Sequence, residues 1–175
     1  RLREIEKSST EKGEVIGVNA QIRSEGGSNS GVGFAIPINI VQRVVPALIA
    51  NGEYQHSYMG VSGGTLSPVC AEDLGVPHEL RGAIVNQVLP NSPAEDAGLH
   101  AGDELSDTHY PSICPETRGG DIILAINDQP VTKFDDVLGY LQRTTSPGDT
   151  VTLTIWRDGE TLQLDLVLGA RPASL

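Results

Sequence analysis

The chain has 175 residues, of which 38% are hydrophobic and 20% are charged, a composition typical of one or two globular domains. Its net charge is −11, and residues 51–175 carry eighteen Asp/Glu against six Lys/Arg. This balance excludes the basic footprint of a nucleic-acid-binding protein, and no apolar run approaches the ~18 residues of a membrane span.

The N-terminal residues carry little structural signal. Residues 1–12 are polar and lack periodicity, so we expect a loose terminus. No signal-peptide pattern opens the chain at Arg1. This start suggests a fragment or a processed product whose export signal would lie upstream.

Two strands and one helix are expected next. β-branched residues predict strands over 13–22 and 31–38, with turn residues at 23–30 between them. Apolar residues at spacings of three and four then predict a helix that begins at an Asn39 N-cap and stops at Asn51-Gly52. Two strands cannot bury a core alone, so this piece needs a covering partner.

The rest of the chain mixes short helices with strands. The Asp158-Gly159 pair predicts the turn of a β-hairpin. Ser92, Pro93 and Glu95 form a capping box at the start of a short helix. Strands are expected at 58–63, 82–89, 121–128, 150–157 and 160–168, helices at 67–76, 92–99 and 133–143, and a turn at 128–131. The pattern predicts the α+β class, with a small antiparallel unit over 57–170.

One stretch reads as an insertion. Ala101-Gly102-Asp103 is echoed by Gly119-Gly120-Asp121, and removal of the residues between would join two parts of a compact unit. We therefore expect an insertion at about 103–120, and loops of this length are uncommon without a role of their own.

The Gly-rich segment 26–37, GGSNSGVGFAIP, allows three interpretations. A phosphate cradle would need a helix after the glycines, and a strand follows instead. Ser30 as a nucleophile would need a histidine and a carboxylate as partners, and no such set is evident. A turn between two strands is therefore favoured. We expect no cofactor.

The two cysteines, Cys70 and Cys114, have no zinc-ligand spacing, and we expect no metal. They are either two buried thiols or one disulfide, and a disulfide would indicate an oxidising compartment.

GEVIGVNAQI, the Gly-rich turn, GVGFAIPIN and an apolar helix together resemble the end of the trypsin-like domain of HtrA/Deg serine proteases. YMGV, RGAIVNQVLPNSPAEDAGLHAGD and GGDIILAINDQPV resemble the PDZ domain of the same family. The resemblance implies a protease remnant at 1–52, a linker at 53–57 and a PDZ domain, a small antiparallel β-sandwich with flanking helices, at 58–172.

The resemblance leaves enzymatic activity open. In the family, a Gly-Asn-Ser-Gly-Gly loop precedes the GEVIG strand. Ser8 and Ser9 lack flanking glycines, so no catalytic residue is assigned to this chain. Gly31, Gly33, Phe34 and Ala35 would belong to the strand that lines the protease specificity pocket, or would be plain strand core.

The PDZ resemblance implies capture of an extended peptide by β-augmentation. Tyr58, Met59, Gly60 and Val61 would form the loop that binds the peptide carboxylate, and Ser62 and Gly63 the pairing strand. Val137, Leu138 and Leu141 would form a groove wall, or ordinary core. Gly60→Val is expected to weaken binding and leave the fold intact.

The implied function is substrate recruitment and regulation in an HtrA-like endopeptidase, a hydrolase of protein quality control. The alternative is a stand-alone, non-catalytic PDZ scaffold module. Expected partners are C-terminal or unfolded polypeptide segments, the rest of the protease domain, and further copies in a homo-oligomer. The expected location is extracytoplasmic, either periplasmic or membrane-anchored facing outward.

Overall fold

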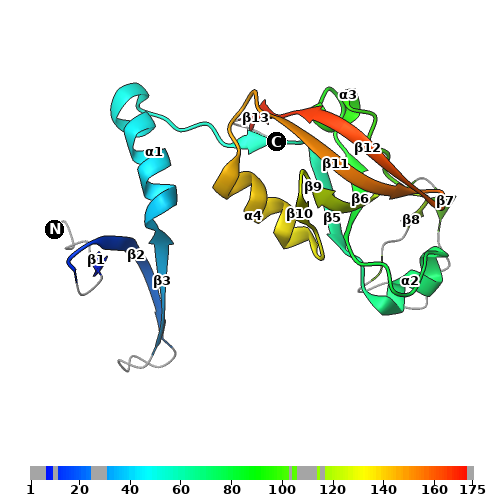
Figure 1. Ribbon diagram of the computed structural model, residues 1–175, viewed down its shortest axis with the longest axis horizontal. Coiled ribbons are helices and arrows are strands. Elements are labelled where there is room, and N and C mark those ends of the chain that lie inside the picture. The colour runs from blue at the N-terminus through cyan, green and yellow to red at the C-terminus, as the bar shows by residue number, and fades with distance from the viewer. Residues whose placement is uncertain are drawn as a thin grey trace. The chain divides into compact units, whose positions relative to one another are not determined.

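The computed structural model describes residues 7–9, 12–24, 31–102, 104–105, 114 and 117–172. The chain forms two compact units, unit 1 (Arg1–Tyr54) and unit 2 (Gln55–Leu175). The α+β class expected from the sequence is confirmed, with antiparallel sheets and few helices (Figure 1).

Unit 1 is a three-stranded antiparallel sheet followed by one helix. Its strands are β1 (Lys7–Ser9), β2 (Val15–Ser24) and β3 (Gly31–Pro37), in the order β1-β2-β3. Ser24 pairs with Gly31, as the turn interpretation of the Gly-rich segment requires, although Ser30 lies outside the described residues. The expectation of a loose terminus is wrong at β1, because pairing with β2 orders residues that have no periodicity of their own.

The helix of unit 1 is α1 (Ile38–Asn51), and its N-cap is Pro37, not Asn39 as expected. Strand β3 runs directly into the helix, so Asn39 already lies in the first turn and lacks the extended backbone of a cap. The C-terminal end is as predicted: Gly52 adopts a left-handed conformation, and its N–H bonds to Leu48 O at 3.0 Å.

Unit 2 is built on an antiparallel sheet with the strand order β12-β11-β9-β6-β5. These strands are β5 (Val61–Thr65), β6 (Ala83–Val88), β9 (Ile122–Ile126), β11 (Thr150–Arg157) and β12 (Glu160–Val167). Short strands form three further pairings: β10 (Gln129–Pro130) with β9, β4 (Ser57–Tyr58) with β13 (Gly169–Ala170), and β7 (Glu104–Leu105) with β8 (Thr117–Arg118). The helices are α2 (Pro68–Leu74), α3 (Pro93–Asp96) and α4 (Phe134–Thr144).

Local chemistry explains several of these elements. The hairpin is confirmed: Arg157 pairs with Glu160, and both Asp158 and Gly159 have positive φ, at 50° and 89°. Ser92 caps α3 as expected, since its hydroxyl accepts from Glu95 N–H. The single strand expected at 58–63 is instead two, because Gly60 has φ +86° and turns the chain between β4 and β5.

Two apolar clusters stabilise unit 2. The larger packs α3 and α4 onto the sheet and includes Met59, Val85, Ile123, Val137, Leu153 and Leu166. The smaller gathers Leu66, Cys70, Ala71, Ile84, Cys114 and Ile122. A disulfide joins Cys70 and Cys114 inside this second cluster, so it ties α2 to the stretch expected to be an insertion. Of that stretch, the structure describes the paired strands β7 and β8.

Candidate functional site

A cavity of about 400 Å³ lies in unit 2 between strand β5 and helix α4. We call it the groove. Helix α4 lies beside β5 in Figure 1, and both elements contribute residues to the lining of the cavity. Its lining comes from four places in the sequence: the β4–β5 segment, the end of β6, helix α4 and the residue after β13. The lining residues are His56, Ser57, Tyr58, Met59, Gly60, Val61, Ser62, Leu89, Phe134, Val137, Leu138, Leu141, Gln142 and Arg171.

The turn at Met59-Gly60 supplies polar backbone groups to this cavity. Its carbonyls are bonded inward: Ala94 N–H donates to Met59 O and Leu89 N–H to Gly60 O, both at 2.8 Å. Among the described residues, no acceptor takes the N–H of Met59 or Gly60. Backbone donors without a partner are rare unless water or a ligand satisfies them. The turn therefore offers two donors to an anionic group.

Gly60 is required in this turn for two reasons. Its φ of +86° is unfavourable for other residues, and an added Cβ would lie 2.2 Å from the Cβ of Ser92. Ser92 is 2% exposed and caps α3. The expectation that Gly60→Val leaves the fold intact is therefore wrong, because the substitution would also displace the α3 segment.

Strand β5 lies at the edge of the sheet. Its inner side pairs with β6, with Val61 opposite Val88 and Ser62 opposite Gln87. Val61 and Ser62 line the groove, whereas Gly63, named with them from the sequence, does not. A Cβ on Gly63 would lie 2.7 Å from the Phe134 ring, so this glycine lets the helix approach the strand.

Helix α4 forms the opposite wall. Val137 is fully buried and Leu141 is 8% exposed, and both belong to the larger apolar cluster while lining the groove. Leu138 is 43% exposed on the same wall. Groove wall and ordinary core, which the sequence left as alternatives, thus both describe Val137 and Leu141, whereas Leu138 lines the groove without belonging to the core.

The first turn of α4 is held by Asp136. Its carboxylate accepts from Thr132 N–H at 2.9 Å, from the Thr132 hydroxyl at 2.8 Å and from Lys133 N–H at 3.1 Å. These bonds, led by the one from Thr132 N–H, hold the pKa of Asp136 below its ordinary value of 3.8. The start of the groove helix is therefore fixed by an ionised carboxylate.

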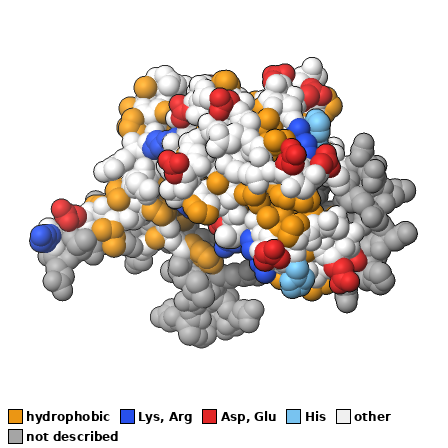
Figure 2. All heavy atoms as spheres, turned by 45° about the vertical axis from the view of Figure 1, so that its right-hand side comes forward, with side chains coloured by type: hydrophobic (Ala, Val, Ile, Leu, Met, Phe, Trp, Pro, Cys, Tyr) orange, Lys and Arg blue, Asp and Glu red, His pale blue; other side chains and the backbone are white. Residues whose placement is uncertain are grey.

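The charge of the lining differs from that of the chain. The net charge is −11, yet the groove lining contains no Asp or Glu and includes Arg171 and His56. On the face in Figure 2, acidic side chains lie in separate small groups. An anionic ligand would thus meet little repulsion inside the groove.

Several lining residues were not identified from the sequence. Phe134 lies in the helix expected at 133–143, three and four residues before Val137 and Leu138, and this spacing could have assigned it to the groove. Arg171 and Leu89 gave no local signal, because they reach the cavity only through the β13–β4 pairing and the Leu89 N–H bond to Gly60 O.

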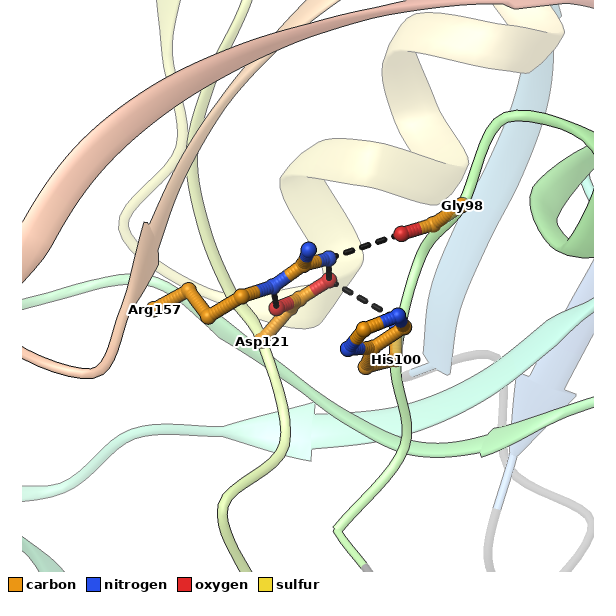
Figure 3. A network of polar contacts seen from close by, with 4 residues as sticks. All are labelled: Gly98, His100, Asp121 and Arg157. Carbon is orange, nitrogen blue, oxygen red and sulfur yellow. Dashed lines mark hydrogen bonds and ion pairs between the residues drawn. The ribbon is translucent and has the colours of Figure 1, made fainter.

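A buried ion pair joins Asp121, just before β9, to Arg157, at the end of β11 (Figure 3). Asp121 is fully buried, and Arg157 donates to its two carboxylate oxygens at 2.6 and 2.7 Å. Asp121 also accepts from His100 N–H, and Arg157 donates to Gly98 O. The bonds to Asp121 raise the pKa of Arg157 above its ordinary value, although burial opposes the shift. The pair fastens the chain that follows α3 to β9 and β11.

The protease-like residues lie apart from this site, in unit 1. Gly31, Gly33, Phe34 and Ala35 belong to β3, which pairs with β2. Phe34 is 54% exposed and Ile36 is 42% exposed, so plain strand core does not describe these side chains in the present chain.

In the part of the chain that the structure describes, a second cavity is present, but no metal site and no helix that could span a membrane. There, no group of three or more His, Cys, Asp or Glu side chains forms a metal site. A second cavity, of about 420 Å³, is lined by Trp156, Leu74 and Ile122 among others. It adjoins the interior strands β9 and β11 and so offers no free strand edge. No described helix is both long and apolar enough to cross a membrane.

Comparison with known proteins identifies the class. Residues 57–168 match the family model of the PDZ domain, and the chain belongs to this family. Over 162 residues it is 34% identical to the probable periplasmic serine protease do/HhoA-like of Haemophilus influenzae, covering 93% of this chain and 30% of that protein. It is 33% identical to the periplasmic serine endoprotease DegP of Escherichia coli, covering 89% of this chain and 29% of DegP.

Solved structures of serine proteases also resemble this chain. The HtrA-type protease AlgW with decapeptide has a TM-score of 0.68 and 29% identity, over 91% of this chain and 43% of that one. The serine endoprotease from Yersinia pestis has a TM-score of 0.56 and 25% identity, over 91% of this chain and 44% of that one. The resemblance to HtrA/Deg proteases predicted from the sequence is confirmed. The chain spans about 30% of the length of the curated relatives.

Proposed function

We propose that the groove binds the free C-terminal end of an extended polypeptide. The observation that carries this proposal is the pair of backbone donors at Met59 and Gly60, which have no partner among the described residues and adjoin an apolar cavity and an edge strand. A peptide can add a strand to such an edge, with main-chain bonds for affinity and side-chain pockets for specificity. The coarser role, peptide binding and regulation by a PDZ domain, follows from the family.

Each part of the groove takes one part of the ligand. The turn Tyr58-Met59-Gly60-Val61 binds the terminal carboxylate through backbone N–H groups, which need no basic side chain. Strand β5 pairs with the peptide from Val61 and Ser62 onward. The terminal side chain is apolar, because it enters between Met59, Val137, Leu138 and Leu141.

The strength of this binding is modest. A few main-chain bonds and one buried apolar side chain give affinity on the order of micromolar, or about −8 kcal/mol. Such binding suits the sampling of many exposed chain ends, as protein quality control requires.

In the whole protein, the PDZ domain recruits substrates to, or regulates, an HtrA-like serine endopeptidase. Similarity to the proteases extends over unit 1 as well as unit 2, which favours this function over a stand-alone scaffold module. The domain boundaries proposed are 1–52 for the protease part, 53–57 for the linker, whose last residue Ser57 already pairs within β4, and 58–172 for the PDZ domain.

Unit 1 completes its apolar core with the rest of the protease domain, and Gly31, Gly33, Phe34 and Ala35 then line the specificity pocket. The assembled protein is a homo-oligomer. It works in the periplasm, where the relatives are named as residing. The disulfide between Cys70 and Cys114 supports an oxidising compartment.

Calorimetry with matched peptides tests the proposal. A hexapeptide that ends in a free Val carboxylate should bind at least tenfold more tightly than its C-terminal amide, a difference of about 1.4 kcal/mol. Leu138→Ser should weaken binding about fivefold, because it removes apolar contact from the groove wall. Val69→Ser is the control, since Val69 is 45% exposed, like Leu138 at 43%, but lies on α2 outside the groove. Equal binding of acid and amide would refute carboxylate capture.

A further inference from the structure

Two hydroxyl groups at one end of the groove connect its two walls. We propose that Ser57 and Thr145 are positioning residues that fix the width of the groove and thereby select the size of the peptide's terminal side chain. This inference rests on the proposed function, because it assumes that a terminal side chain enters the groove.

Both hydroxyl groups contact one backbone carbonyl oxygen of helix α4, that of Leu141. Ser57 Oγ lies 3.1 Å from Leu141 O and 2.7 Å from Thr145 Oγ1, and Thr145 Oγ1 lies 2.9 Å from Leu141 O. Thr145 is 4% exposed. Two hydroxyl protons serve these three contacts, so one hydroxyl donates to the other and the other donates to the carbonyl. Residues more than 80 apart in sequence are joined in this way.

Ser57, the partner on the strand side, lies just before the Met59-Gly60 turn that is proposed to bind the carboxylate. Ser57 and Tyr58 form β4, and Met59 and Gly60 follow at once. On its other side, β4 is held by β13, with Ala170 opposite Ser57 and an Arg171 N–H bond to His56 O at 2.9 Å. The hydroxyl pair therefore links the C-terminal end of α4 to β4, which pairs with β13 and precedes the Met59-Gly60 turn.

A second connection holds the other end of the helix. Phe134 N–H, at the start of α4, donates to Thr65 Oγ1 at 3.1 Å, and Thr65 ends the edge strand β5. The Phe134 ring also packs over Gly63. Helix α4 is thus fastened to the strand side at both ends, and the Val137 and Leu138 turn that lines the groove lies between the two connections.

If the two walls are held at a fixed distance, the groove limits the size of the terminal side chain that it can accept. Three apolar lining residues of the groove, Met59, Val137 and Leu141, are 8% exposed or less. A larger terminal side chain can be accommodated only if α4 moves away from β4, and the hydroxyl pair opposes this movement. In apolar pockets, small differences in side-chain size change binding about 10- to 200-fold.

The test compares two peptides that differ only at the last residue, Val or Phe, each with a free carboxylate. The wild-type chain should prefer the Val peptide about tenfold or more. Ser57→Ala removes the hydroxyl that contacts both Leu141 O and Thr145 Oγ1, and it should lower this preference at least threefold, mainly through tighter binding of the Phe peptide. Thr145→Val keeps the shape but leaves Ser57 able to donate to Leu141 O, so it should act in the same direction with a smaller effect.

Two controls separate positioning from general stability. Thr145→Ser retains the hydroxyl and should restore the preference. Thr152→Val removes the bond from Thr152 Oγ1 to Asp165 Oδ1, at 2.7 Å on the β11–β12 hairpin away from the groove, and should leave the preference unchanged.

The outcomes distinguish this inference from the proposed function. A preference that persists in both Thr145→Val and Ser57→Ala, or a wild-type chain that binds both peptides equally, would overturn the width selection alone. A wild-type chain that binds neither free-acid peptide would overturn the proposed function itself.

Discussion

Units 1 and 2 differ in where their apolar side chains lie. The buried hydrophobic residues of the described chain all belong to unit 2, beginning at Met59. In unit 1, helix α1 buries no residue. Seven large apolar side chains are exposed there: Val15, Ile16, Phe34, Ile36, Val45, Leu48 and Ile49. Unit 2 has a core of its own, whereas unit 1 shows apolar surface that folded proteins usually cover.

In unit 2, burial and hydrogen bonds define a groove whose lining residues contact one another. In unit 1, the residues with a family role, such as Phe34, stand on a sheet that the described chain leaves uncovered. Their role must therefore be tested in a longer protein.

The largest effect is expected from Asp121→Ala. It leaves the guanidinium of Arg157, which is 17% exposed, without its buried partner. We expect the free energy of unfolding of unit 2 to fall by about 4 kcal/mol. Trp156 is the one tryptophan of the chain, so its fluorescence in a urea titration reports unit 2. The exposed Glu72 provides the control Glu72→Gln, and a loss no greater than that of the control would show that the pair does not stabilise the unit.

Reduction of the disulfide should have the next largest effect. The bond closes a loop between residues 44 apart, so its loss should lower the free energy of unfolding by about 3 kcal/mol. Urea titration with and without dithiothreitol measures this change. In the Cys70→Ser/Cys114→Ser variant the reductant should have no effect, and a wild-type transition that is equally insensitive would contradict the prediction.

A matched pair of methyl deletions compares the two units directly. Ile123 is fully buried in unit 2, and Ile49 is 81% exposed in unit 1. Ile123→Val should cost about 1 kcal/mol of unfolding free energy, and Ile49→Val less than about 0.5 kcal/mol. Scanning calorimetry of both variants provides the comparison. Equal costs would mean that the Ile49 face is covered in this chain.

The smallest effect concerns the start of α4. Replacing Asp136 with Asn removes the charge that the helix N-terminus favours, at a cost of about 0.5 kcal/mol near pH 7. Because folding lowers the pKa of Asp136 below 3.8, its contribution is present above that pH and is lost as the pH falls through the lower folded value. The stability gap between wild type and Asp136→Asn should therefore close in acid, and a gap that is constant with pH would contradict this.

The elements governed by local chemistry were predictable from the sequence. The Asp158-Gly159 hairpin and the Ser92 cap depend on neighbouring residues, and both are present in the structure. The N-cap of α1 was missed because strand β3 continues directly into the helix. Strand β1 was missed because only pairing with β2 defines it.

The groove was only partly predictable from the sequence, because several of its contacts join residues that lie far apart in the chain. The family motif located the turn at Tyr58–Val61 and the helix wall. It gave no sign of the contacts of Arg171, of the Ser57–Thr145 bond or of the Asp121–Arg157 pair, whose partners lie far apart in sequence. Such contacts arise from tertiary packing, which local patterns do not encode.

The central claim is that the backbone donors of Met59 and Gly60 bind a peptide carboxylate. NMR titration of the ¹⁵N-labelled chain measures this directly. With a free-acid peptide, the amide resonances of Met59 and Gly60 should shift most, and with the amidated peptide these shifts should largely vanish. Equal shifts with both peptides, or shifts centred on the Trp156 cavity, would contradict the claim.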